Sequence, residues 1–259
     1  VDGPVPEHEL VLGGRLEGQP PATSGHAIEV RLNAENVDAG FSASPGLVEM
    51  LRLWVPIAAI SSCSESVRAG IERLADGVWT NECVNGYAHG RGDVEHSAEP
   101  SADSVPTMLL IRHGDPFWYE RNLQSCKTIK DLFMGLDQKG YPRFKSSDFG
   151  VERLVQDDHR RGVDTGYHAR AMKHFLWQAW YGNEDAKDWF LRWVDGWREV
   201  AVLDAPDKPA GVLPGCIWYP TGSYQPPGGD PWYLCQAGYG AWGLPDMIHD
   251  CFLGAYALT

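Results

Sequence analysis

The chain has 259 residues, 43% of them hydrophobic and 22% charged, which is typical of a globular protein with one large domain or two ordinary ones. Its net charge of -13 argues against a nucleic-acid or anionic-membrane partner, because phosphate groups would be repelled. No apolar run approaches the roughly 20 residues of a membrane-spanning helix, and no N-terminal segment has the residue order of a signal peptide.

Six cysteines are scattered along the chain without a CxxC pair or metal-finger spacing. The sequence therefore indicates neither a zinc module nor a redox motif, and we expect no cofactor and no bound metal. We expect buried free thiols, with a disulfide between Cys216 and Cys235 as the alternative in an oxidising compartment.

Residues 1–60 are predicted to form a small β-containing region. Apolar residues alternate at Ile28, Val30 and Leu32, which is the period of a half-buried strand. The region contains the segments GHAIEVRLNAE and, after it, GFSASPGLVEMLRL. Their amino-acid sequence is similar to the C-terminal part of biotin carboxylase domains.

This resemblance covers residues 25–53 and implies that Arg31 takes the place of an arginine that faces the reacting biotin. The family's glycine-rich phosphate loop and metal-binding segment have no counterpart in residues 1–24. We therefore expect no complete ATP-dependent carboxylase, and we expect Glu29 and Arg31 to form a surface pair on a strand.

Residues 61–104 are predicted to be transitional. Val67, Ile71 and Leu74 have helical spacing, and Gly77 is expected to end this helix. The polar stretch that follows is predicted to be a long functional loop or a linker. Its histidines and carboxylates could form a metal site or an acid/base pair, with a solvated loop as the alternative. These residues are His89, Asp93, Glu95, His96 and Glu99.

From residue 105 the chain becomes helical and aromatic. A short apolar helix is expected to stop at His113-Gly114, and Asp115-Pro116 supplies an N-cap and a first-turn proline for the next helix. That helix is predicted to end at Gly135. Its apolar stripe consists of Tyr119, Leu123, Cys126, Ile129 and Phe133.

The same unit recurs further along the chain. A helix that ends at Tyr181 is followed by a Gly182-Asn183 turn and by a second helix, capped by Asn183, whose tryptophans 189, 193 and 197 are expected in the core. A third copy begins with a helix from about Asp246 and is incomplete. Repeated helical hairpins separated by long loops are typical of an α/α toroid.

The segments HGDPFWYERN and HARAMKHFLWQAWYGNEDA, with this hairpin rhythm, resemble the α/α-toroid fold of polysaccharide lyases and six-hairpin glycosidases. We therefore predict a mainly α chain, with helical hairpins of an incomplete toroid over residues 105–259, after the β-containing region 1–60 and the transitional region 61–104. Two and a half hairpins cannot close a ring, so we expect the remainder of a larger chain as a partner.

The densest ionisable cluster lies at the entry to the helix that ends at Tyr181. Cleaving a glycosidic bond requires a proton donor with a carboxylate, or a base with a group that neutralises a uronate. On a helix starting near Asp164, His168 would lie at i+4 and be oriented by the carboxylate, with a capping Asp and a solvated His as the alternative. The catalytic candidates are Asp158, His159, Asp164, Tyr167 and His168, and Arg160, Arg161 and Arg170 are expected to bind a carboxylate or sulfate.

Aromatic residues provide a further signal, because eleven tryptophans exceed the ordinary need of a core. Those expected in loops could stack on sugar faces, and they are Trp118, Trp218, Tyr219 and Trp232.

We predict a carbohydrate-active enzyme that cleaves an anionic polysaccharide or oligosaccharide, uronate-containing or sulfated, by β-elimination or hydrolysis. Eight basic and five acidic residues between Lys139 and Lys173 fit such a substrate. The alternatives are a non-catalytic carbohydrate-binding or scaffold protein and a fragment of a biotin-dependent carboxylase. A secreted or periplasmic location accompanies the carbohydrate hypothesis.

Overall fold

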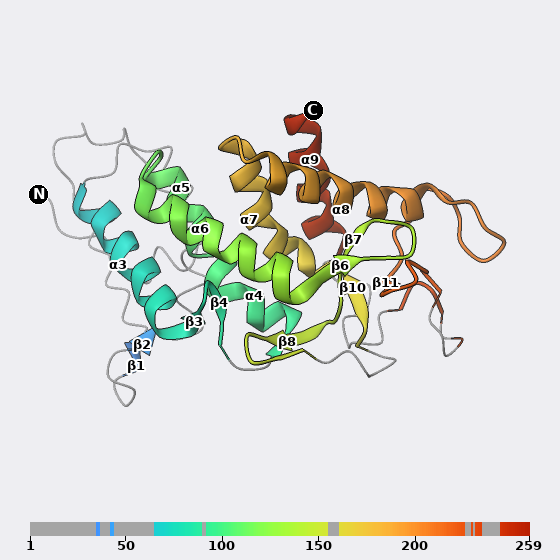
Figure 1. Ribbon diagram of the computed structural model, residues 1–259, viewed down its shortest axis with the longest axis horizontal. Coiled ribbons are helices and arrows are strands. Elements are labelled where there is room, and N and C mark those ends of the chain that lie inside the picture. The colour runs from blue at the N-terminus through green and yellow to red at the C-terminus, as the bar shows by residue number, and fades with distance from the viewer. Residues whose placement is uncertain are drawn as a thin grey trace, which may run out of the picture. The chain divides into compact units, whose positions relative to one another are not determined.

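The computed structural model describes residues 35–36, 42–43, 65–89, 92–154, 161–225, 229, 231–234 and 244–259. All of them belong to one of the two units into which the chain divides, residues 34–259. About 56% of the described residues are helical, and no strand among them exceeds three residues (Figure 1). The predicted mainly α fold class is therefore confirmed.

Two helical hairpins are present where the sequence predicts them. Their helices are α5 (Val105–Ile111) with α6 (Pro116–Thr128), and α7 (His168–Trp180) with α8 (Glu184–Val202). Each turn contains a glycine with positive φ, +79° at Gly114 and +86° at Gly182, a conformation that glycine adopts without strain. The next residue caps the second helix: Asp115 accepts a hydrogen bond from the Phe117 amide, and Asn183 accepts one from the Ala186 amide.

Helix α7 is the central element of this unit. It packs against α4 (Val94–Ala102), α6, α8 and α9 (Leu244–Leu258), and Figure 1 shows it between α6 and α9. Helix α9 buries Ile248, Cys251 and Ala255, which have helical spacing along one face. Trp193 and Trp197 of α8 are fully buried as predicted, whereas Trp189 is half-buried.

The predicted transitional region contains more regular structure than the sequence suggests. Helix α3 (Glu65–Glu82) continues past Gly77, which keeps a negative φ, so the predicted end is wrong. After it, Asn85-Gly86 forms the two-residue turn of a hairpin between β3 (Cys83–Val84) and β4 (Tyr87–Ala88).

The predicted loop or linker before residue 105 is also wrong, because it contains β5 (Gly92–Asp93) and α4 (Val94–Ala102). Helix α4 forms here because Val94, Ala98 and Ala102, at steps of four, bury one face in the core. Most of the other positions of α4 are polar, so its apolar period is not obvious in the sequence.

Short antiparallel strands gather in the long segments between hairpins. They are β6 (Met134–Leu136), β7 (Pro142–Phe144), β8 (Asp148–Gly150), β9 (Arg153–Leu154), β10 (Val163–Thr165) and β11 (Cys216–Trp218). Strand β6 pairs with β7, β10 with β11, and β8 lies between β5 and β9. Helix α6 continues through a π-helical turn to Phe133, so Gly135 lies in a strand and not at the predicted helix end.

Of the stretch that resembles biotin carboxylase, the structure describes only the two-residue ladder between β1 (Glu35–Asn36) and β2 (Ser42–Ala43). Glu29 and Arg31 lie outside the described residues. Among the helices of the described part, none combines the length and the apolar character needed to cross a membrane.

Candidate functional site

The entry to α7 is a strand, a turn and a helix start, not one continuous helix. Asp164 lies in β10 and α7 begins at His168, so the predicted i+4 relation on a helix is wrong. The turn between them still brings the side chains together, with 3.1 Å between Asp164 Oδ1 and His168 Nδ1. Both residues are fully buried.

Both ring nitrogens of His168 have other hydrogen-bond partners. Nε2 lies 3.0 Å from the carbonyl oxygen of Ser146, which can only accept, so Nε2 carries a proton. Nδ1 accepts a hydrogen bond of 2.8 Å from the Thr165 amide. In this neutral form Nδ1 has no proton to donate, so its approach to Asp164 is not a hydrogen bond. This environment favours a structural role for His168.

Asp164 instead belongs to a buried ion network with Asp137, Arg143 and Trp193. Its Oδ2 accepts a hydrogen bond of 2.8 Å from Trp193 Nε1 and lies 3.8 Å from Arg143 Nη1. Arg143 is fully buried and donates from Nε to Asp137 Oδ2 over 3.0 Å. The network joins the β6–β7 hairpin to β10 and α8, and no local sequence signal marks Arg143 as its centre.

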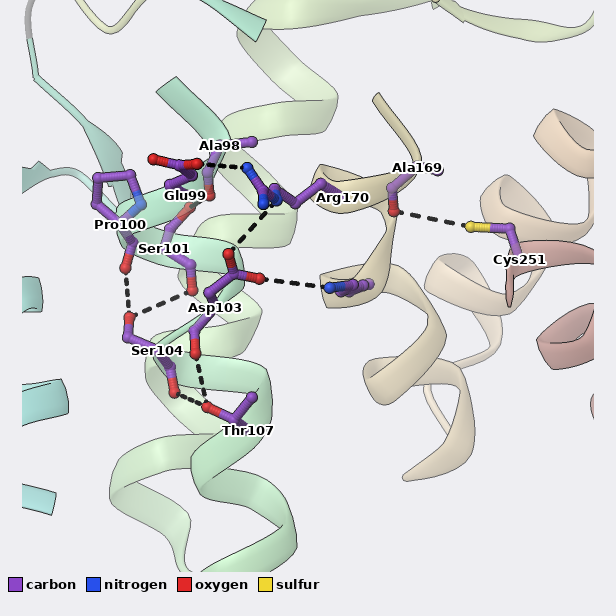
Figure 2. A network of polar contacts seen from close by, with 11 residues as sticks. Ala98, Glu99, Pro100, Ser101, Asp103, Ser104, Thr107, Ala169, Arg170 and Cys251 are labelled. Atoms are coloured by element: carbon purple, nitrogen blue, oxygen red, sulfur yellow. Dashed lines mark hydrogen bonds and ion pairs between the residues drawn. The ribbon is translucent and has the colours of Figure 1, made fainter. Parts of the chain in front are cut away.

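A second polar arrangement lies between α4 and α7 (Figure 2). Arg170 Nη1 is 2.7 Å from Glu99 Oε1, and Arg170 Nε is 3.4 Å from Asp103 Oδ2. Lys173, one turn further along α7, places Nζ 3.3 Å from the other oxygen of Asp103. These four residues, Glu99, Asp103, Arg170 and Lys173, are called the polar seam below.

The polar seam is buried on one side and open on the other. The Asp103 and Arg170 side chains are 1% and 3% exposed, whereas those of Glu99 and Lys173 are 17% and 32% exposed. Burial raises the pKa of Glu99 above its usual range; the adjacent Arg170 opposes this shift, and Asp103 adds to it. The Glu99 carboxyl therefore keeps its proton to a higher pH than an ordinary glutamate, which is a property of acid/base groups in active sites.

One residue from each of the two clusters predicted from the sequence, Glu99 and Arg170, meets the other in the polar seam. Glu99 and Arg170 are 71 positions apart in the chain and form an ion pair. Strand pairing places the Asp93 backbone opposite Asp148, and Asp148 forms an ion pair with Arg161, whose side chain is 40% exposed. Glu99 and Lys173 are the partly exposed charges of the polar seam, and Arg161 is partly exposed beside Asp148.

Several predicted site residues fall elsewhere or outside the described residues. Asp158, His159 and Arg160 lie outside them, as do the side chains of Asp93 and Glu95. His89 and His96 are exposed, and Tyr167 is half-buried at the start of α7.

In the part of the chain that the structure describes, no three His, Cys, Asp or Glu side chains are grouped to hold a metal ion. The alternative disulfide also stays a prediction, because Cys235 lies outside that part.

The predicted sugar-stacking aromatics are mostly covered. The predicted loop position of Trp118 is wrong, because Trp118 lies on α6 and is fully buried. Its indole N–H donates a hydrogen bond of 3.1 Å to Glu72. Trp218 is 5% exposed within β11. Tyr219 and Trp232 are half-buried, and the Trp232 indole donates to the Asp207 carbonyl.

Asp103 and Lys173 are two members of the polar seam that the sequence reasoning did not select. Spacing is the signal that could have found them, because Asp103 follows Glu99 by four positions and Lys173 follows Arg170 by three. Two acidic and two basic side chains then project from two neighbouring segments.

Comparison with protein-family models, with curated proteins and with solved structures gives no match for this chain. The function of the polar seam is therefore inferred from the charges, burial and distances of its own side chains.

Proposed function

We propose that this chain is a carbohydrate-active enzyme that cleaves an anionic polysaccharide or oligosaccharide at the polar seam. The observation that carries the proposal is Glu99, a partly exposed carboxyl whose pKa is raised although it touches the buried guanidinium of Arg170. Cleavage of a glycosidic bond needs such a proton donor or acceptor, together with groups that hold the charged substrate.

Two reactions use these residues differently. In β-elimination, ionised Glu99 would take the proton from the carbon beside a uronate carboxylate, and the partly exposed ammonium group of Lys173 would neutralise that carboxylate. The electron pair of the broken C–H bond would form a C=C bond, the glycosidic C–O bond would break, and the leaving oxygen would take up a proton from water. In hydrolysis, protonated Glu99 would donate its proton to the leaving oxygen, and a second carboxylate, for which Asp148 is the candidate, would activate the attacking water on the other side of the sugar. Arg170 would hold Glu99 in position in both reactions.

We also propose that the hairpins form part of an α/α toroid. The two hairpin turns touch, because the Tyr181 hydroxyl donates to the Leu109 carbonyl over 3.3 Å and accepts from the Gly114 amide over 3.4 Å. Both turns lie at the same end of the helices, and the N-terminus of α7 lies at the other end (Figure 1). Stacked hairpins with aligned turns are the arrangement that such a repeat requires.

A non-catalytic carbohydrate-binding protein is the second candidate. The complete burial of Asp164 and His168 favours it, because these residues are the predicted acid/base pair. Bicarbonate-dependent ATP turnover by the chain would instead favour a carboxylase fragment.

The test is to incubate the full chain with uronate-containing and sulfated polysaccharides and to follow absorbance near roughly 235 nm together with reducing ends. Elimination raises both signals, and hydrolysis raises only the reducing ends. Glu99→Gln keeps the size of the side chain and an oxygen for Arg170 but cannot transfer a proton, so activity should fall by about 100-fold or more.

Glu184→Gln, an exposed glutamate at the start of α8, is the matched control and should leave activity unchanged. Full activity of Glu99→Gln would exclude the polar seam as the reactive site. Binding of a polysaccharide without any cleavage by the unmodified chain would establish the second candidate instead.

A further inference from the structure

The exposed face of α6 carries a hollow of about 610 Å³. We call it the α6 hollow, and its lining includes Pro116, Phe117, Glu120, Arg121, Gln124 and Lys127. It shares no residue with the polar seam. Its lining residues all lie on α6, so the hollow is an open surface depression along one helix.

Phe117 provides an aromatic surface in this hollow that is both exposed and fixed. The residue is 51% exposed, and its ring packs edge to face with that of the buried Trp118 at a centroid distance of 5.3 Å. The Arg121 guanidinium lies 4.1 Å from the Phe117 ring centroid and is anchored by an ion pair of 2.7 Å with Asp76. A ring that is already ordered loses little conformational entropy when a ligand stacks on it.

The polar rim of the hollow offers a carboxylate, a carboxamide and an ammonium group to a sugar. Glu120, Gln124 and Lys127 follow one another at helical spacing, so they project from one side of α6. A carboxylate accepts hydrogen bonds from hydroxyls, a carboxamide both donates and accepts, and an ammonium group binds a carboxylate or sulfate. Lys127 is exposed and forms no ion pair with another described residue, so its charge is available to a ligand.

We propose that the α6 hollow binds a sugar ring of an anionic polysaccharide at a site separate from the polar seam. The ring stacks on Phe117, its hydroxyls reach Glu120 and Gln124, and its carboxylate or sulfate lies against Lys127. The choice of ligand rests on the proposed function. The consequence is that the hollow holds the polymer and does not take part in bond cleavage.

The experiment measures binding without cleavage. The full chain with Glu99→Gln runs in native gels that contain polygalacturonate or chondroitin sulfate, and retardation gives the affinity for each polymer. Adding Phe117→Ala should weaken binding between about twofold and tenfold, the range of an aromatic stacking contact. Phe117→Trp should retain binding, because it keeps an aromatic surface.

Leu110→Ala is the matched control, because Leu110 is another large apolar residue, 45% exposed, on the neighbouring helix α5. It should leave the retardation unchanged. The inference is overturned if neither polymer retards the chain, or if Phe117→Ala binds as tightly as the parent. If Phe117→Ala weakens binding while the unmodified chain cleaves no polysaccharide, the α6 hollow stands and the proposed catalytic function fails.

Discussion

Replacing Asp164 by alanine separates its structural role from the predicted catalytic one. The carboxylate is fully buried, accepts a hydrogen bond from Trp193 Nε1 at 2.8 Å and lies 3.8 Å from Arg143 Nη1. Its removal leaves the indole N–H without its acceptor and leaves Arg143 paired with Asp137 alone. The free energy of unfolding should therefore fall.

The size of this loss follows from the burial of the whole network. Asp137 still balances the charge of Arg143 after the substitution, so the main cost is the buried indole N–H that has lost its acceptor, about 1 to 3 kcal/mol. This loss corresponds to roughly 2 to 12 °C in Tm for a chain of this size. Asp164→Asn keeps an oxygen for the indole and should lose less than Asp164→Ala.

Urea unfolding followed by tryptophan fluorescence measures these losses. Asp188→Ala is the control, because Asp188 forms an ion pair with Arg192 on the surface of α8 and should contribute about 1 kcal/mol or less. A loss below about 1 kcal/mol for Asp164→Ala would refute the buried-network reasoning. Full stability with lost cleavage activity would restore Asp164 as a catalytic candidate.

Two further predictions concern α7 and α8. Asn183→Ala removes the acceptor for the Ala186 amide and should lower the free energy of unfolding by about 1 kcal/mol. Asn183→Asp keeps an acceptor and should leave the free energy of unfolding unchanged, so equal losses for the two variants in urea unfolding would contradict the capping role. Burial lowers the pKa of His174 from 6.5 to about 3, so below pH 6.5 the unfolded chain takes up a proton that the folded chain refuses. The free energy of unfolding should therefore fall by roughly 3 kcal/mol between pH 7 and pH 4, and the His174→Gln protein should lack this part of the fall. If the free energies of unfolding of the two proteins differ by the same amount at every pH, the lowered pKa of His174 is excluded as the cause.

The two hairpins could be predicted because their signals are local. A glycine with positive φ followed by Asp115 or Asn183 involves only neighbours in the chain, and the structure shows both caps. The Asn85-Gly86 hairpin turn has an equally local signal that the predicted loop overlooked.

The buried face of α6 was less accessible to prediction. The apolar stripe includes Tyr119 and Leu123, but these residues are half-buried, and Trp118 and Asn122 are fully buried in their place. Asn122 can be buried because its side chain pairs with His174, with 2.7 Å between Oδ1 and Nδ1. A hydrophobic period cannot reveal a polar residue whose partner lies 52 positions away.

The sequence by itself determined the mainly α class, both hairpin turns and the segments in which charged residues concentrate. Tertiary structure decided which charges pair, because Asp164 meets Arg143 and Glu99 meets Arg170 only after α7 has packed against its neighbours. Sequence patterns report contacts within about one helical turn, whereas ion pairs form wherever packing brings opposite charges together away from water. The same packing buried the predicted Asp164 and His168 pair and left Glu99 accessible.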